Sequence, residues 1–197
     1  IDAANAKLSF DGDVALDDSD VNAKGEARAR GNDLADLAKF LPVPLPSLPP
    51  YDLAANVNVR RSSVQLQKLV GKIGDTQFDG TFGADFETNP PTINAALHTA
   101  KLDFDDLAPL IGLPPASGPG ETASPQQQQE TAERKSQLAF LPDTALDFAA
   151  LQQAQGKVTL KADAVESAPF LPLTPFDFDA VLSGKGARII ARDIGIA

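Results

Sequence analysis

Three groups of residues in this chain belong to types that take part in catalysis or ligand binding: one histidine, one group of aspartates and one glycine-containing turn. The histidine is His98, and the chain has no cysteine and no second histidine. Zinc sites and nucleophilic triads both need several such side chains held together, so His98 lacks the partners for either. His98 also falls on the polar phase of an alternating segment, beside Thr99. We therefore expect a histidine that faces solvent.

The aspartates are Asp103, Asp105 and Asp106, whose carboxylates are the type of oxygen ligand that calcium binds. Their spacing lacks the glycine and the distal glutamate of a calcium loop. An apolar stretch follows them, and acidic residues at the start of a helix are stabilised by the helix dipole. We predict a helix start here, with Asp103 as the N-cap, and no metal site.

The glycine-containing turn is Ser183-Gly184-Lys185-Gly186, which superficially resembles a phosphate-binding loop. The full spacing of such a loop is absent and no helical pattern follows, so a hairpin turn is the better interpretation. With all three groups explained structurally, the sequence contains no catalytic residues, predicts no cofactor and favours a protein that is not an enzyme.

The composition predicts a folded chain and excludes some functions. The chain has 197 residues, of which 43% are hydrophobic, enough to form a core. Its formal net charge is −10, which excludes nucleic acid as a partner because phosphate neutralisation needs a basic surface. No stretch reaches the roughly 20 apolar residues of a membrane-spanning helix, and none has the pattern of a signal peptide. The chain begins at Ile1 and contains no methionine, so we expect an interior segment of a longer polypeptide.

Alternation of apolar and polar residues is the strongest structural pattern in the chain. Between residues 51 and 60 every odd position is apolar, and most even positions are polar. The alternation continues through residues 64–67, 78–86 and 93–98, with turn residues between these segments. A period of two predicts half-buried strands, and short turns between them predict hairpins. We predict four consecutive strands that form an antiparallel meander.

A weak internal repeat relates two parts of the chain. Residues 34–41 align with residues 104–111 at an offset of 70 residues. Each stretch follows a strand-like segment, which is residues 21–30 for the first, and each leads to prolines. We predict a short helix at both places.

The chain divides into three regions. Residues 1–113 hold the β-meander repeats with short helices. Residues 114–136 are rich in proline and glutamine, lack apolar periodicity and are predicted to form an exposed linker. Residues 137–197 continue the sheet, with a short helix at 146–151 and strands around 158–164 and 176–182. A last strand around 189–194 lacks a partner, so this region is predicted to be truncated.

The apolar side of the predicted sheet is the remaining candidate for function. Phe78, Phe82 and Phe86 lie on one strand, opposite Ile93 and Leu97 on the next. This surface is either a core, covered by the helices or a second sheet, or an open groove for acyl chains, in which each buried methylene contributes about 0.8 kcal/mol. Few helical residues are available as a cover, which favours the groove. The candidate groove residues are Val57, Val59, Leu66, Phe78, Phe82, Phe86, Ile93, Leu97, Leu160 and Phe178.

Several of these stretches resemble the repeat of the AsmA-like family. The first is Leu45-Pro46-Ser47-Leu48-Pro49-Pro50-Tyr51-Asp52-Leu53, and the second, after the hairpin, is Val70-Gly71-Lys72-Ile73-Gly74-Asp75-Thr76-Gln77-Phe78-Asp79-Gly80-Thr81-Phe82. The resemblance continues in residues 101–112 and again in residues 141–148, so it covers roughly residues 34 to 183. The matching residues are structural glycines and leucines, and no lipid-binding residue of the family carries over by motif.

The resemblance implies a segment of a Gram-negative envelope protein. Such a protein projects a β-groove into the periplasm, is tethered to the inner membrane by an anchor outside this segment, and takes part in phospholipid transport between the membranes and in outer-membrane integrity. The fold class is then mainly β: a curved antiparallel β-sheet meander of the repeating β-groove type, with a few short helices and a Pro/Gln-rich linker. The expected partners are a phospholipid or another acyl-chain lipid, and bacterial membranes through flanking segments.

The alternative is a scaffold for outer-membrane protein biogenesis. In that case the apolar sheet face is buried as core, and exposed edge strands recruit envelope assembly proteins by strand addition. The two hypotheses differ in whether the face of Phe78, Phe82 and Phe86 is covered in the folded protein.

Overall fold

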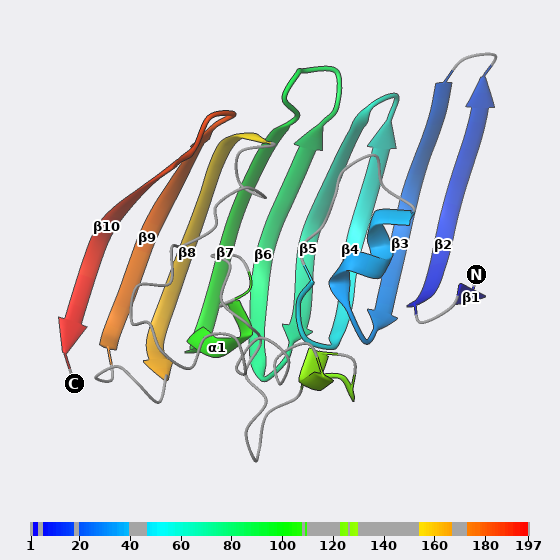
Figure 1. Cartoon of the computed structure of the whole chain (residues 1–197). Coiled ribbons are helices and arrows are strands. Elements are labelled where there is room, and N and C mark those ends of the chain that lie inside the picture. Colours follow the sequence, from blue (N-terminus) through cyan, green and yellow to red (C-terminus); the bar gives the residue numbers. More distant parts are fainter. Residues whose placement is uncertain are drawn as a thin grey trace.

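One twisted, open β-sheet forms the body of the protein, as the computed structural model shows (Figure 1). The structure describes residues 2–3, 6–17, 20–39, 47–107, 109, 123–125, 127–129, 154–166 and 173–196. Within these residues the strands lie in the sheet in the order of the sequence. They are β1 (Asp2–Ala3), β2 (Ala6–Asp17), β3 (Asp20–Gly31), β4 (Tyr51–Arg60), β5 (Ser63–Ile73), β6 (Thr76–Asp85), β7 (Thr92–Asp103), β8 (Gln155–Glu166), β9 (Leu173–Ser183) and β10 (Ala187–Ile196).

The predicted antiparallel meander is confirmed. Strands β4 to β7 coincide with the four alternating segments, and each pairs antiparallel with the next. The turn between β4 and β5 uses Arg61 with a φ of 49°, and the Ser63 hydroxyl donates to the Arg60 carbonyl at 3.0 Å. Strands β8, β9 and β10 confirm the segments predicted after the linker. The hairpin predicted at Ser183 is also present, because the Ser183 amide donates to the Gly186 carbonyl at 3.0 Å.

One pairing departs from a simple meander. Strands β7 and β8 run parallel, in register from Thr92 opposite Gln155 to Asp103 opposite Glu166. A parallel pair needs a connection long enough to bring the chain back to the end of the sheet where the first strand began. The 51 residues from 104 to 154 supply that length. The sheet is therefore mixed, although most of its pairs are antiparallel.

Bulges interrupt the register around β5. The pairing of β5 shifts against β4 between Ala54 and Asn56, and against β6 between Leu66 and Leu69. Lys68 lies inside both shifts and has a φ of 49°. An extra residue on one strand bends that strand and increases its local twist. The bulges thus contribute to the predicted curvature of the sheet.

Both predicted short helices are present, at the same ends of their strands (Figure 1). The 3₁₀ helix η1 (Leu34–Lys39) follows β3, and the helix α1 (Phe104–Leu107) follows β7. The Asp33 carboxylate accepts from the Ala35 amide at 2.9 Å, and the Asp103 carboxylate accepts from the Asp105 amide at 3.1 Å. Asp103 therefore caps the helix as predicted.

Asp106 ties α1 to the turn between β5 and β6. One oxygen of its buried carboxylate accepts from the Asp75 amide at 2.9 Å, the Thr76 amide at 2.9 Å and the Thr76 hydroxyl at 2.8 Å. Burial raises the pKa of the Asp106 carboxyl, and the hydrogen bonds from Thr76 and Asp75 lower it less than burial raises it. Gly74 has a φ of 57°, and a Cβ there would lie 1.6 Å from this carboxylate, so the contact requires glycine.

The predicted linker, residues 114–136, lies largely outside the described residues. Its described residues Ala123 and Gln127 are 7% and 1% exposed, so the predicted exposure is wrong for these two. The helix predicted at 146–151 lies outside the described residues. The last strand, β10, does have a partner, because it pairs along its length with β9.

Candidate functional site

The two faces of the sheet differ in chemistry. Residues opposite one another on neighbouring strands point to the same face, so the register assigns every strand residue to a face. One row runs from Gly12 through Gly25, Val57, Leu66, Phe82, Ala95, Val158 and Ala180 to Ile189. The side of the sheet that carries this row is called the apolar face below. The opposite side, which carries Gln65, Thr81 and Asn94, is called the polar face.

The helix η1 covers one part of the apolar face. Leu37 of η1 packs with Ala6 of β2 and Tyr51 of β4, and these three residues are 8%, 6% and 4% exposed. Half-buried residues of the neighbouring strands surround them. This cluster is a small core at the end of β3 where η1 begins, and it explains why the helix lies on this face.

The helix α1 covers a second part of the apolar face. Phe104 and Leu107 pack against a core of buried residues from β7 and β8. The β9 residues Leu173, Phe176 and Phe178 close the same core from the other side. The core consists of Leu102, Leu160, Ala162 and Val165.

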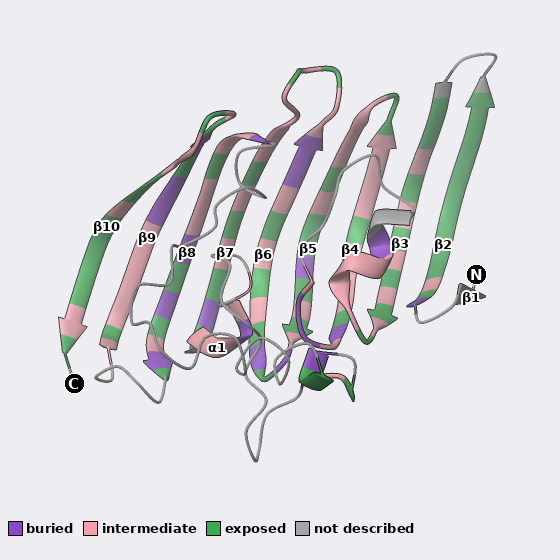
Figure 2. Ribbon diagram, in the orientation of Figure 1, coloured by how far each residue is buried: buried purple, intermediate pink, exposed green. Residues whose placement is uncertain are grey.

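Other parts of the apolar face are open to solvent. Figure 2 shows that the strands at the two ends of the sheet, β2 and β10, are mostly exposed. Phe10, Val14 and Leu16 of β2 are 40%, 55% and 77% exposed, and Ile189 and Ile196 of β10 are 56% and 73% exposed. By the register all five point to the apolar face. The face is therefore partly core and partly free surface.

The predicted groove residues divide between these two environments. Leu160 is 6% exposed and belongs to the core under α1, so it is not free to contact a ligand here. Leu97 and Phe178 pack against that core and are half-buried. The remaining candidates are half-buried and belong to neither core: Val57, Val59, Leu66, Phe78, Phe82, Phe86 and Ile93.

Sequence reasoning missed the most exposed part of the apolar face. Leu8, Phe10, Val14 and Leu16 alternate along β2, yet this strand was not predicted. Their alternation was the signal, weakened by Gly12 in its middle. The C-terminal isoleucines were predicted to form a strand, but not to belong to the same surface.

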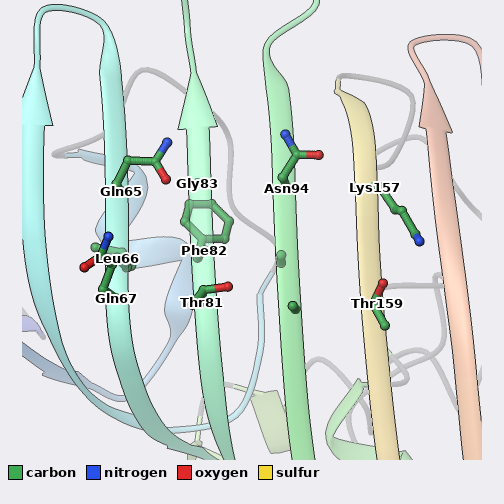
Figure 3. Close-up of a pocket in the computed structure, with 11 residues that line it drawn as sticks. Gln65, Leu66, Gln67, Thr81, Phe82, Gly83, Asn94, Lys157 and Thr159 are labelled. Carbon is green, nitrogen blue, oxygen red and sulfur yellow. The ribbon is translucent and has the colours of Figure 1, made fainter.

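The polar face carries a shallow trough of about 470 Å³ across β5 to β8 (Figure 3). Gly83 lies between Gln65 and Asn94 in the register. Because glycine has no side chain, the backbone at Gly83 forms part of the trough floor. Figure 3 shows the amides and hydroxyls that line it, together with one ammonium group. The polar lining side chains are Gln65, Gln67, Thr81, Asn94, Lys157 and Thr159. The trough can form hydrogen bonds, but it opens on the opposite side of the sheet from the exposed apolar residues of β2 and β10.

A buried carboxylate holds one wall of this trough. Asp179 of β9 is 3% exposed and accepts from the Thr159 hydroxyl at 2.8 Å and from the Arg192 Nε at 2.8 Å. Its carboxylate also pairs with the Lys157 ammonium at 3.1 Å. The hydrogen bonds from Thr159 and Arg192 lower the pKa of Asp179 to about 2. Lys157 is thus fixed by a structural ion pair.

His98 lies on the polar face, exposed as predicted, but it is not isolated. Its Nδ1 lies 3.2 Å from the Asp79 carboxylate of β6, and its Nε2 lies 3.3 Å from the Asp163 carboxylate of β8. Hydrogen bonds to these two carboxylates raise the pKa of His98. The imidazole therefore bridges three strands, including the parallel pair.

The described residues contain no cluster of metal ligands. Among them, no group of three or more His, Cys, Asp or Glu side chains is placed to hold a metal ion. No helix in the described part of the chain is long and apolar enough to cross a membrane. The described residues form an open β-sheet with one apolar and one polar face. Comparison with protein-family models, with curated proteins and with solved structures finds no match.

Proposed function

We propose that the apolar face binds the acyl chains of phospholipids or of other lipids with long hydrocarbon chains. The observation that carries this proposal is that most of the exposed large apolar side chains, those of β2, β3 and β10, lie on one face of an unclosed sheet. Burying a large apolar side chain stabilises a protein by about 1.5–3 kcal/mol relative to leaving it in water, so exposed ones favour a ligand that covers them. Contiguous apolar surface on a folded protein marks a site of interaction.

The geometry of the sheet sets how such a chain would lie. Neighbouring strands are about 4.8 Å apart, so a hydrocarbon chain lying across the strands meets a new apolar row residue about every 4.8 Å. The row through Val57, Leu66 and Phe82 crosses the sheet from β2 to β10 without a charged residue. Head groups would remain at the edge of the face, in water. Movement of a lipid along the row would be passive, because the row consists of glycine and apolar residues, which cannot drive an energy-consuming step.

The cellular setting of the proposal comes from the resemblance to AsmA-like proteins. In that setting the chain is a segment of a periplasmic protein that is tethered to the inner membrane and carries phospholipid toward the outer membrane. A single open sheet with a lengthwise apolar face is the architecture that such a groove requires. Several sheet segments in series would extend the path.

The scaffold hypothesis is the second candidate, and a described sheet that does not close on itself, and so has strand edges, favours it. Edge strands bind other polypeptides by strand addition. That hypothesis also needs the apolar face to be buried as core, and the exposure of Phe10, Val14 and Ile189 counts against this. We therefore rank it below lipid binding.

Photocrosslinking at neighbouring positions tests the proposal. Val59 points to the apolar face and Asn58, the residue before it, points to the polar face of the same strand. Phe82 and Thr81 form a second such pair on β6. A photoreactive amino acid is placed at each position in turn, the protein is produced in the periplasm of a Gram-negative bacterium whose phospholipids carry a radioactive label, and the cells are irradiated. We expect labelled lipid on the protein at positions 59 and 82.

Positions 58 and 81 are the matched controls, because each is the sequence neighbour of a tested position on the same strand but points to the opposite face. Equal labelling at all four positions would mean nonspecific contact with membranes. Absence of label at 59 and 82, with the folded state verified by circular dichroism, would contradict lipid binding and move the preference to the scaffold.

A further inference from the structure

The trough on the polar face differs in chemistry from the ion-paired parts of the same face. Elsewhere on this face charged side chains bind one another: the Arg30 Nε lies 3.0 Å from the Asp52 carboxylate, and His98 bridges the carboxylates of Asp79 and Asp163. The trough across β5 to β8 is lined by amides and hydroxyls, and no carboxylate is among its lining groups. Its binding capacity therefore comes from uncharged groups.

Side-chain size along two neighbouring rows of the sheet shapes the trough. Each row places a small residue between two larger polar ones, on strands that pair with one another. The rows are Gln65-Gly83-Asn94 and Thr81-Ala96-Thr159. Figure 3 shows Gln65 and Asn94 on either side of Gly83. Because neighbouring strands are about 4.8 Å apart, the outer residues of each row stand about 10 Å apart over a floor of small residues.

Four lining side chains have unused hydrogen-bonding capacity. All four are exposed, and none forms a hydrogen bond with another described residue: Gln65, Gln67, Thr81 and Asn94. A carboxamide offers two donors and one acceptor oxygen, and a hydroxyl both donates and accepts. These groups gather around a volume of about 470 Å³, which lies within the usual range of small-molecule sites.

The ammonium group in the lining is already neutralised. The Lys157 Nζ lies 3.1 Å from the carboxylate of Asp179, a buried residue that also accepts from the Thr159 hydroxyl at 2.8 Å. An anionic ligand would have to compete with Asp179 for this ammonium. A cationic ligand would find no carboxylate in the lining. The trough therefore suits a ligand that is polar but uncharged.

We propose that the trough binds a neutral oligosaccharide. Each saccharide hydroxyl donates and accepts, so it matches carboxamides and hydroxyls without a counter-charge. The trough is shallow, so it suits an extended ligand that lies across the strands better than a compact one that must be enclosed. The trough and the apolar face lie on opposite sides of the sheet. This site is therefore independent of the proposed lipid binding.

The side-chain amides of the trough can report on binding directly. In proton–nitrogen correlation NMR spectra the NH₂ groups of Gln65, Gln67 and Asn94 give signals that single variants assign. Maltotetraose, cellotetraose and tetra-N-acetylchitotetraose are each added up to about 10 mM. That concentration exceeds the dissociation constant of about 1 mM expected where hydrogen bonds to water are exchanged for hydrogen bonds to the ligand. We expect at least one of these neutral saccharides to shift the three NH₂ signals in a saturable manner.

A double variant and a matched control test the location of the site. Gln65→Ala combined with Asn94→Ala removes the two amides beside Gly83, and both side chains are exposed and belong to neither core. We expect about tenfold weaker binding, followed at the Gln67 signal. Asn22→Ala removes an exposed amide from β3, on the polar face but outside the trough, and should bind like the wild type.

Three results would overturn the proposal. The first is the absence of shifts with all three neutral saccharides. The second is undiminished affinity in the double variant, because the saccharide would then bind elsewhere. The third comes from tetragalacturonic acid: binding of this anion alone, lost in Lys157→Gln, would identify an anion site in place of a site for neutral saccharides.

Discussion

His98 is the side chain in this protein whose charge responds to pH near neutrality. Its two ring nitrogens lie beside the carboxylates of Asp79 and Asp163, which come from the strands on either side of β7. A protonated imidazole donates to both, whereas a neutral one donates to only one. The bridge across three strands is therefore complete only while His98 is charged.

We expect the contribution of His98 to stability to depend on pH. The hydrogen bonds to Asp79 and Asp163 raise its pKa in the folded state above the unfolded value of about 6.5. A raised pKa means that the stabilisation is fully present below about pH 6.5 and is lost as the pH rises through the folded pKa. Replacing His98 by Gln should therefore lower the free energy of unfolding in urea at acidic pH more than in alkaline solution.

The folded pKa of His98 can be measured directly, because the chain contains one histidine. An NMR titration of the imidazole follows that single residue, and Asp79→Asn should shift the titration to lower pH. A pKa at or below about 6.5, or no shift in Asp79→Asn, would refute the bridge.

The sequence predicted the exposure of His98 but not its partners. Exposure follows from alternation, which is local. Asp79 and Asp163 lie 19 and 65 residues away and reach His98 only through the pairing of β6, β7 and β8. The same limit applies to Asp179, whose burial and low pKa depend on Lys157, Thr159 and Arg192 from neighbouring strands.

The two short helices occupy equivalent places in the repeat, but their capping aspartates accept different sets of hydrogen bonds. Asp33 and Asp103 lie 70 residues apart and occupy the same position before η1 and α1. Among the described residues, the Asp103 carboxylate accepts from the Asp105 amide alone. The Asp33 carboxylate accepts from the Ala35 amide and also from the Ser47 hydroxyl at 2.7 Å and the Leu48 amide at 3.2 Å. Asp33 therefore caps a helix and also fixes the chain that enters β4.

Removing each cap should expose this difference. Asp103→Ala should lower the free energy of unfolding by about 1 kcal/mol, the usual effect of a lost N-cap. Asp33→Ala should cost about 2–4 kcal/mol, because it also leaves the donors of Ser47 and Leu48 without their acceptor. Urea unfolding followed by circular dichroism measures both. Equal losses would mean that the contacts of Asp33 with Ser47 and Leu48 contribute little to stability.

Most elements could be predicted from the sequence because their patterns are local. Alternation identified β4 to β10, and the repeat identified both helices. Strand direction was not predictable in the same way: β7 and β8 alternate like the other strands, and their parallel pairing depends on the path of the 51 residues between them. Strand β2 was missed because its alternation is interrupted by Gly12.

At the scale of the whole molecule, coverage of the apolar face distinguishes the two proposed functions, and local patterns do not determine coverage. The sequence placed Leu160 and Phe82 in one class of apolar strand residues. In the fold, α1 packs over the core that contains Leu160, whereas Phe82 belongs to neither core. The difference arises from where each helix lands on the sheet.

The continuous pairing of β7 with β8 joins the strands before and after the predicted linker into one sheet. Leu160→Ala should cost about 2–5 kcal/mol, because the buried leucine leaves a cavity in the core under α1. The chain contains one tyrosine and no tryptophan, so intrinsic fluorescence reports on Tyr51, which lies in the other core, under η1. If the sheet unfolds as a unit, Leu160→Ala shifts the urea midpoint of Tyr51 fluorescence as far as that of the circular dichroism. Val181→Ala, at an exposed position on β9, should shift neither. A dichroism transition that splits while the Tyr51 midpoint stays in place would show that the two parts of the sheet fold independently.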